Sequence, residues 1–263
     1  MSTSLPPRPD LDDERLPVEP EGARPLATWR WWEVVLVTIV AFVAGVLVAT
    51  PLFLVFDPDP SGSVDGPALL ISAVADVVMA GVLLLWLRAR HPGWPRLIGW
   101  PPVGARLRES AVGAGWGVLL EVIAVVIGAL VAVALEAATG QTVESPEQVS
   151  PDLRGWAVVM LVVLAVIVAP VVEEFVFRGL LFRSIADRHG FWIGAVLSAV
   201  PFGLTHAAVG AEVDLWALRI TLMVVGVVLA WIHWRRRNLL ANIVAHSTFN
   251  VIGVVLILSD VGG

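Results

Sequence analysis

Residues 156–172 read WAVVMLVVLAVIVAPVV, a run without a single charge. Its length is close to the ~20 apolar residues that cross the ~30 Å hydrocarbon core of a bilayer. The next six residues, EEFVFR at 173–178, bring two glutamates and an arginine into the same segment. The run predicts a membrane helix. The charged cluster indicates a functional site, because ionisable groups inside a span cost roughly 2.5–3.5 kcal/mol each on insertion scales.

The apolar pattern continues along the chain, whose 263 residues are 57% hydrophobic and 15% charged. Such a balance is typical of a polytopic membrane protein. Helices are the default for its spans, because backbone polar groups cannot stay unpaired in lipid. We therefore predict an all-α fold, a polytopic transmembrane helix bundle of about seven spans. The seven apolar stretches are Trp31–Phe56, Pro67–Leu87, Ala111–Leu135, Gly155–Phe182, Phe191–Val209, Leu215–Trp234 and Leu239–Leu258.

Three regions are expected along the chain. Residues 1–29 are Pro-rich and acidic with few large apolar residues, which predicts a disordered cytoplasmic tail. Residues 30–153 contain N-terminal transmembrane helices, and residues 154–263 contain the transmembrane region that carries the unusual polar residues. The absence of cysteine excludes disulfides and thiol chemistry.

Arginine placement predicts the orientation of the helices. All 17 basic residues are arginines, and fourteen of them fall in the tail or in alternate connections between stretches, whereas the intervening connections are acidic. The positive-inside rule then places the N-terminus in the cytoplasm and the C-terminus outside. We expect an integral, multi-pass protein of a bacterial cell membrane, in contact with lipid and with no nucleic-acid partner.

The last four stretches carry polar residues in pairs one helical turn apart. Glu174 and Arg178 are four residues apart, so they lie on one helix face and can form an ion pair. Glu173 is about 100° round the helix from Glu174, which allows it to face another partner.

Two later motifs add histidines inside spans. PFGLTH places His206 one turn after a phenylalanine, and HSTFN places His246 one turn before Asn250. The other three histidines lie in or beside arginine-rich connections, where a histidine is unremarkable. Pro170 and Pro201 lie close to these polar clusters and each removes one i→i−4 hydrogen bond. They are expected to free the carbonyls of residues 166 and 197 and to open space for a pocket.

The chemistry that suits this set is attack by water, since no Ser, Cys or Lys is placed as a convincing nucleophile. Glu173 is the candidate base, because desolvation makes a carboxylate a stronger base, and a neutral histidine could hold the same water. An imidazole N–H of His246 and an amide N–H of Asn250 could stabilise the tetrahedral oxyanion. Glu174 with Arg178 would support the site.

A zinc site is the main variant. Glu173, His206 and His246 could bind Zn²⁺ as a His₂Glu set with one position left for water. No HExxH motif exists, and the sequence does not choose between the metal-assisted and the metal-free mechanism.

The ordered motifs EExxxR, FxxxH and HxxxN on successive apolar segments resemble the CPBP family, the CAAX-prenyl-protease and bacteriocin-processing-like intramembrane proteases, also called the Abi family. The resemblance covers roughly residues 155–258 and implies a membrane endopeptidase, often labelled a metalloprotease, that acts on a peptide or membrane-protein substrate. It implies that Glu173 and His206 activate water, that His246 and Asn250 stabilise the oxyanion, and that Glu174 and Arg178 support them.

One estimate conflicts with a shared site. At ~1.5 Å per residue, Glu173 lies about 15 Å and His246 about 12 Å from the predicted cytoplasmic helix ends, but His206 lies about 22 Å away. Convergence therefore requires the fifth helix to tilt or to start earlier than drawn.

Two other functions remain open. An ion- or proton-coupled transporter would use Asp76, Glu121 and Glu173 as a relay, although no internal repeat is visible. A non-catalytic membrane scaffold would retain the fold alone and would have no need of the histidine and asparagine motifs.

Overall fold

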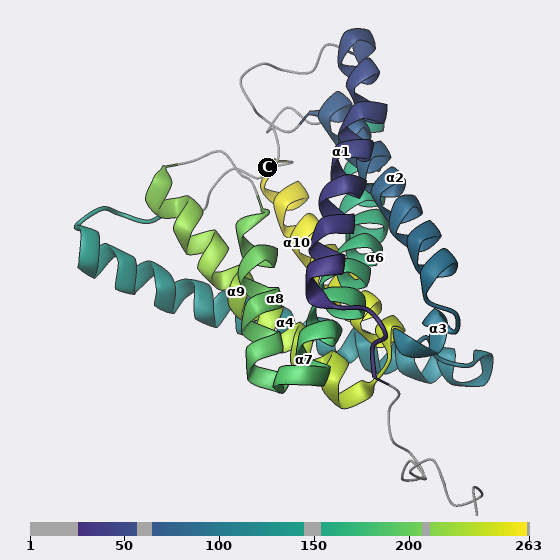
Figure 1. Ribbon diagram of the computed structural model, residues 1–263. Helices are drawn as coiled ribbons and strands as arrows, with labels where there is room; N and C mark the ends of the chain where they lie inside the picture. The colour runs from purple at the N-terminus through teal and green to yellow at the C-terminus, as the bar shows by residue number, and fades with distance from the viewer. Residues whose placement is uncertain (1–25, 57–64, 145–153, 207–210, 262–263) are drawn as a thin grey trace, which may run out of the picture.

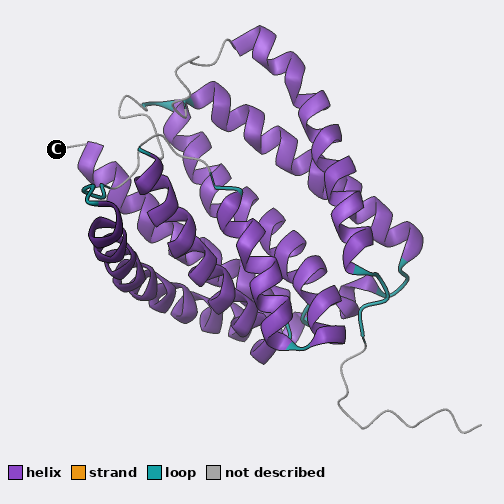
Figure 2. Cartoon of the chain, turned by 60° about the vertical axis from the view of Figure 1, so that its left-hand side comes forward, coloured by secondary structure: helices purple, strands orange, loops and turns teal. Residues whose placement is uncertain are grey.

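The computed structural model describes residues 26–56, 65–144, 154–206 and 211–261, and all regular structure in these ranges is helical (Figures 1 and 2). The helices are α1 (Trp31–Phe56), α2 (Gly66–Arg90), α3 (Trp94–Leu97), η2 (Val103–Ala105), α4 (Arg106–Thr139), α5 (Trp156–Val162), η3 (Val163–Val168), α6 (Ala169–Glu173), η4 (Glu174–Phe182), α7 (Arg183–His189), α8 (Phe191–Leu204), α9 (Glu212–Arg236) and α10 (Leu239–Val261). The segments η3 and η4 are π-helical, so α5 to α7 form one continuous helix, Trp156–His189.

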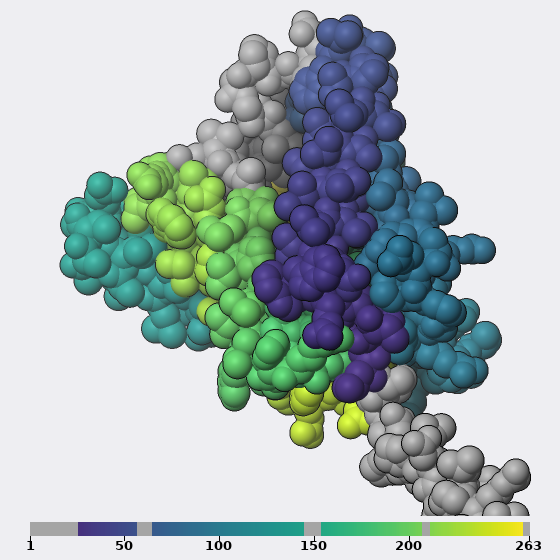
Figure 3. Space-filling view, in the orientation of Figure 1, coloured from purple at the N-terminus to yellow at the C-terminus, as the bar shows by residue number. Residues whose placement is uncertain are grey.

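The predicted fold class is confirmed. Six helices of the described chain are long and apolar enough to cross a membrane: α1, α2, η2–α4, α5–α7, α9 and α10. Their outer faces carry large exposed apolar side chains, as on α1, which runs along the front of the molecule in Figure 3. The chain is an integral, multi-pass membrane protein.

The fifth apolar stretch is shorter than predicted. Helix α8 has 14 residues, or about 21 Å, and cannot cross the bilayer core alone. It ends at Leu204 because the next two side chains bind its last turn: the Thr205 hydroxyl and His206 Nδ1 both contact the Phe202 carbonyl oxygen, at 2.9 and 2.7 Å. These side chains replace the backbone donors that a longer helix would supply.

The arginine-rich segments gather at one end of the bundle. In Figure 1, the start of α1, helix α3 and helix α7 all lie at the lower end. Much of two predicted acidic connections, at 57–64 and 145–153, lies outside the described residues, as do residues 1–25 of the predicted tail and residues 207–209 of the fifth stretch. The arrangement agrees with alternating spans, and which end faces the cytoplasm stays a prediction.

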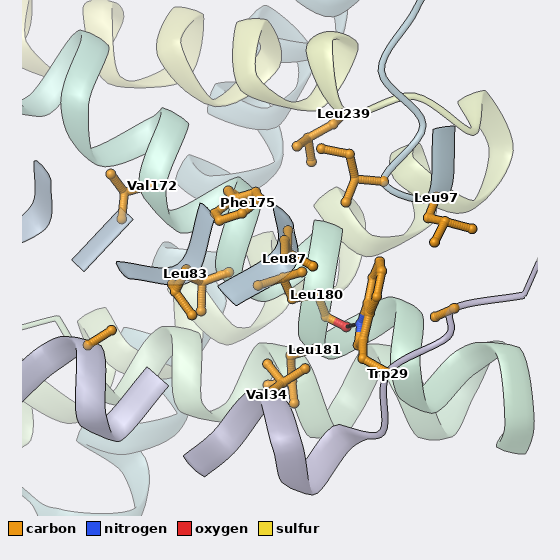
Figure 4. Close-up of a cluster of buried hydrophobic side chains, with 14 of the residues drawn as sticks. Trp29, Val34, Leu83, Leu87, Leu97, Val172, Phe175, Leu180, Leu181 and Leu239 are labelled. Carbon is orange, nitrogen blue, oxygen red and sulfur yellow. Dashed lines mark hydrogen bonds between the residues drawn. The ribbon is translucent and has the colours of Figure 1, made fainter. Parts of the chain in front are cut away.

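Residues 26–29, the last part of the predicted tail, pack against the bundle. Trp29 is fully buried, and its indole Nε1 donates to the Leu180 carbonyl oxygen at 3.1 Å (Figure 4). Asp187 Oδ2 accepts a hydrogen bond from the Ala27 N–H at 2.8 Å, and Arg188 donates to the Ala27 carbonyl oxygen at 2.9 Å. The chain is therefore fixed to η4 and α7 before α1 begins.

The helix Trp156–His189 lies at the centre of the bundle. Its π-helical segment η4 buries eight of nine residues. Figure 4 shows apolar side chains of α1, α2 and α10 meeting η4 in one cluster, with Val34, Leu83 and Leu239 around Leu180. A segment that is buried on nearly all sides, as η4 is, is one on which a site can be held rigidly.

Helix α4 approaches α10 through glycines. A Cβ added at Gly117 would lie 2.5 Å from both the Ala245 carbonyl oxygen and the Thr248 Cβ. No such contact can exist, so a side chain at this position must push α10 away. By contrast, a Cβ at Gly115 on the same helix would meet nothing within 4 Å.

These two glycines give a matched pair of variants. Gly117→Ala is expected to destabilise the protein by roughly 1–3 kcal/mol through overpacking and to reduce any activity that depends on α10. Gly115→Ala should be neutral or stabilising by up to about 1 kcal/mol, since alanine is the better helix former. Thermal unfolding of both proteins in one detergent checks this. Equal unfolding temperatures would contradict the close α4–α10 contact.

Candidate functional site

The Glu174 carboxylate is fully buried and is surrounded by three donors from two helices. Arg178 Nη1 donates to Oε1 at 2.9 Å, and His246 Nδ1 lies 3.0 Å from the same oxygen. Asn242 Nδ2 donates to Oε2 at 3.0 Å. A buried charge is tolerated when it is paired and hydrogen-bonded in this way, so the predicted Glu174–Arg178 pair is present and ties the central helix to α10.

The Arg178 guanidinium is held on its other sides by α8 and α9. Its Nη2 donates to the Gly226 carbonyl oxygen at 3.2 Å, and its Cζ lies 4.2 Å from the centroid of the Phe202 ring. The same ring makes edge contacts with His206 and His246, at centroid distances of 4.9 and 5.8 Å. The phenylalanine of the FxxxH motif thus contacts the buried cation and both histidines.

Both histidine rings point Nε2 toward Glu173. His206 Nε2 lies 4.0 Å and His246 Nε2 lies 3.9 Å from Glu173 Oε2. The other nitrogen of each ring is engaged: His206 Nδ1 contacts the Phe202 carbonyl oxygen, and His246 Nδ1 contacts Glu174. Because both of these partners are acceptors, the hydrogen lies on Nδ1 in each ring. A neutral ring then presents the lone pair of Nε2 to Glu173.

Glu173 differs from its neighbour in exposure. Its side chain is 26% exposed, yet Oε2 is buried and has no hydrogen-bond partner among the described residues. The two adjacent glutamates therefore face opposite nitrogens of the same His246 ring, Glu174 at Nδ1 and Glu173 at Nε2. This separation is the one predicted from their ~100° angle on the helix.

Asn250 is one turn beyond His246 and contacts the central helix at another point. Its Nδ2 donates to the Ala165 carbonyl oxygen at 2.7 Å. In η3 the Ala169 N–H donates to Leu164, five residues back, so the donor for Ala165 would be residue 170. That residue is a proline without an N–H. The freed carbonyl is thus expected at Ala165 rather than at residue 166, because the π-helical register shifts the partner by one.

The mismatch between the predicted depths of His206 and Glu173 arises because the predicted end of the central helix, Phe182, precedes its actual end, His189. The central helix continues to His189 instead of ending at Phe182, and it forms a hairpin with α8 in which Gly194 lies against Ala186. His206 lies twelve residues after Gly194 along α8, and Glu174 lies twelve residues before Ala186 along the central helix. The two arms therefore reach the same level, although α8 starts where it was predicted.

Helix α10 begins deeper in the bundle than the depth estimate assumed. Leu239 lies against Gly179, and its N–H donates to the Gly99 carbonyl oxygen at 3.1 Å. Seven residues further along α10 is His246, and seven residues back along the central helix is residue 172, next to Glu173. Because of these two helix contacts, the three motifs lie at the same depth in the bundle.

Asn242 belongs to this site and was missed from the sequence. It is fully buried, and its Nδ2 also donates to the Leu229 carbonyl oxygen of α9 at 2.8 Å. The available signal was spacing, since Asn242 precedes His246 by four residues and shares its helix face. Helix α9 contributes two backbone carbonyls, those of Gly226 and Leu229, and backbone contacts of this kind cannot be recognised from a sequence.

The residues predicted as zinc ligands are spaced more widely than the ligands of one tetrahedral ion. Zinc at 2.0–2.2 Å from tetrahedral ligands places the ligand atoms about 3.3–3.6 Å from one another. The distances of 4.0 and 3.9 Å from Glu173 Oε2 to the two Nε2 atoms are wider. They suit a water molecule that makes hydrogen bonds of about 2.8 Å to each group. Among the described residues, no group of three or more His, Cys, Asp or Glu side chains is arranged to hold a metal ion.

The other ionisable residues within spans lie apart from this hydrogen-bond network. Asp76 on α2 is close enough for its charge to act on Glu173. Arg219 on α9 stacks on Trp216 at 5.6 Å. Glu121 on α4 is half-buried.

An apolar groove of about 720 Å³ runs along the surface between α1, η4, α7 and α8. Its lining includes Trp31, Val34, Phe177 and Leu181, and it extends to Thr205, the residue before His206. The groove therefore leads from one end of the bundle to the neighbourhood of the candidate site.

A comparison with family models locates similarity in the part of the chain that holds the candidate site. Residues 155–252 match the sequence model of the family described as type II CAAX prenyl endopeptidase Rce1-like, which confirms the resemblance drawn from the three motifs. YdiL of Bacillus subtilis (strain 168), provisionally named a membrane peptidase, is 29% identical over 105 residues, 40% of this chain and 40% of that protein. The UPF0177 protein YxdF of Lactococcus lactis subsp. lactis (strain IL1403) is 26% identical over 87 residues, 33% of this chain and 44% of that protein. The chain thus spans less than half the length of these relatives, and no solved structure matches.

Proposed function

We propose, since residues 155–252 match the Rce1-like family model, that the chain is an intramembrane endopeptidase that hydrolyses a peptide bond with an activated water. The observation that carries the proposal is the convergence of two histidine Nε2 atoms on one glutamate oxygen, at 4.0 and 3.9 Å. A carboxylate oxygen and the lone pair of a neutral His206 Nε2 close to one point suit the deprotonation of a water molecule, which leaves His246 to act as a donor.

Glu173 acts as the base in this mechanism. A water hydrogen-bonded to Glu173 Oε2 and to His206 Nε2 has both hydrogens engaged and one lone pair directed at the substrate. Its oxygen bonds to the peptide carbonyl carbon as one proton moves to Glu173. The C–N bond then breaks, and the proton passes from Glu173 to the leaving amine, so that one water is consumed and one peptide bond is cleaved.

The tetrahedral oxyanion needs donors, and α10 supplies the candidates. A His246 ring that carries both protons donates from Nδ1 to Glu174 and from Nε2 to the oxyanion. Asn250 has two amide hydrogens and uses one on Ala165, which leaves the other for the substrate. Preorganised donors of this kind contribute strongly to acyl transfer.

The substrate class follows from the groove beside the site. A peptide or membrane protein that approaches through the lipid would pack apolar groups along α1 and α8 and place its cleavable bond near Thr205 and His206. The positive-inside prediction places the entrance, near Trp31 and His189, on the cytoplasmic side.

Cleavage by the purified chain in lipid vesicles tests the proposal. The probes are a fluorescence-quenched peptide that ends in a farnesylated CAAX sequence and the same peptide without farnesyl. We expect cleavage of at least one probe, at a rate that EDTA and 1,10-phenanthroline leave unchanged, because the distances around Glu173 suit a bound water and are wider than tetrahedral zinc spacing. If neither probe is cut, the proposed activity is wrong. If a chelator abolished cleavage and added zinc restored it, the water would instead be activated by a metal ion.

A further inference from the structure

The two carboxylate oxygens of Glu174 have different numbers of hydrogen-bond donors. Two donors, Arg178 Nη1 and His246 Nδ1, share Oε1, whereas Asn242 is the one donor found on Oε2 among the described residues. All four side chains are at least 97% buried, so water cannot easily replace a missing donor. The orientation of the carboxylate therefore depends on Asn242.

Asn242 is itself fixed by α9. Its Nδ2 lies 2.8 Å from the Leu229 carbonyl oxygen and 3.0 Å from Glu174 Oε2, which engages both amide hydrogens. The Gly226 carbonyl, three residues earlier on α9, receives Arg178 Nη2. Two carbonyls of one helix thus hold the two side chains on either side of Glu174, although α9 carries none of the three motifs.

We propose that Asn242 is a positioning residue of the reaction, which fixes Glu174 so that His246 keeps Nε2 directed at Glu173. This inference rests on the proposed peptidase function. Without Asn242, Oε2 would be a buried anionic oxygen with no donor, and the carboxylate would turn to share Arg178 between its oxygens. His246 would then lose the partner that fixes its Nδ1 and its ring plane.

Substitution of Asn242 should lower the turnover rate and leave substrate binding unchanged. Asn242 is not among the residues that line the groove, so KM is expected to stay unchanged. In Asn242→Leu, kcat is expected to fall roughly 10–100-fold, by analogy with the loss of partners that orient metal-binding histidines. Should Asn242→Leu not fold, Asn242→Ser is the milder variant, whose short hydroxyl cannot bridge both acceptors, and the same separation of kcat from KM is expected.

The chain offers a closely matched control. Asn238 is also a buried asparagine at the start of α10, and its Nδ2 donates to a glutamate, Glu109 Oε2, at 2.6 Å. Its Oδ1 accepts from the Ala241 N–H, so it caps the helix away from the three motifs. Asn238→Ala should lower the unfolding temperature with little change in kcat.

The test compares kcat, KM and unfolding temperature for the wild type, Asn242→Leu, Asn242→Ser, Asn238→Ala and Glu173→Gln, with the quenched peptides in vesicles. Reduced kcat at constant KM in the Asn242 variants alone supports the inference. The inference is overturned if Glu173→Gln is inactive but the folded Asn242 variants keep the wild-type kcat. It is also overturned if the Asn242 variants show the same kcat, KM and unfolding temperature as Asn238→Ala. Full activity in Glu173→Gln would instead overturn the proposed function.

Discussion

Glu173→Gln is expected to abolish cleavage while the protein still folds. Glutamine keeps the size of the side chain but cannot take the proton of water, and a positioned base contributes typically 10²–10⁴-fold to the rate. Because Glu173 makes no described hydrogen bond through Oε2 and its side chain is 26% exposed, little stability should be lost. Cleavage of the quenched peptide, measured beside thermal unfolding, checks both parts.

Glu121→Gln is the matched control for this result, since Glu121 is also a glutamate within a span but lies on α4. It should keep the wild-type rate. Equal losses in the two variants would favour a relay of carboxylates along the membrane, as in the transporter hypothesis. An active Glu173→Gln protein would exclude Glu173 as the base.

Arg178→Met is expected to cause the largest loss of stability of any substitution considered. It leaves the Glu174 carboxylate buried without its cation, and breaking a buried pair on one side costs typically 3–5 kcal/mol. The contact of the guanidinium with the Phe202 ring at 4.2 Å is lost as well. The free energy of unfolding in a fixed detergent gives the comparison.

The double variant Arg178→Met/Glu174→Gln should recover part of that loss, because it removes both charges. Arg219→Met serves as the control: Arg219 also lies within a span but is only half-buried, stacks on Trp216 and has no salt bridge among the described residues, so its loss should be clearly smaller than that of Arg178→Met. An Arg178→Met protein as stable as the wild type would show that the pair is not buried as described.

Much of the bundle could be predicted from the sequence, because apolar runs without charge have few alternatives in lipid. The Glu174–Arg178 pair followed from helical spacing, and so did the separate direction of Glu173. These features depend on residues within one segment, where periodicity is reliable.

The missed features depend on contacts between segments or on backbone detail. The length of α8 is set by the Thr205 and His206 side chains, which bind its last turn. The continuation of the central helix to His189 crosses the polar residues of α7, which mark a helix end in sequence but here lie partly buried. The π-helical register moves the free carbonyl to Ala165, and no local pattern predicts that shift.

The convergence of the motifs was the least predictable part of the site. It depends on where helices start relative to one another: Gly194 against Ala186, and Leu239 against Gly179. Depths counted from the predicted helix ends cannot include such offsets. Asn242 stayed hidden for a related reason, since its importance comes from the backbone of α9 and not from a motif.

The central claim is that a water held at Glu173, and not a side chain of the protein, attacks the peptide bond. Single-turnover cleavage in H₂¹⁸O with added hydroxylamine tests it most directly, with both products analysed by mass spectrometry. The account predicts one ¹⁸O in the new carboxylate and no hydroxamate, because no acyl-enzyme forms. A hydroxamate product, or a peptide covalently attached to the protein, would contradict it.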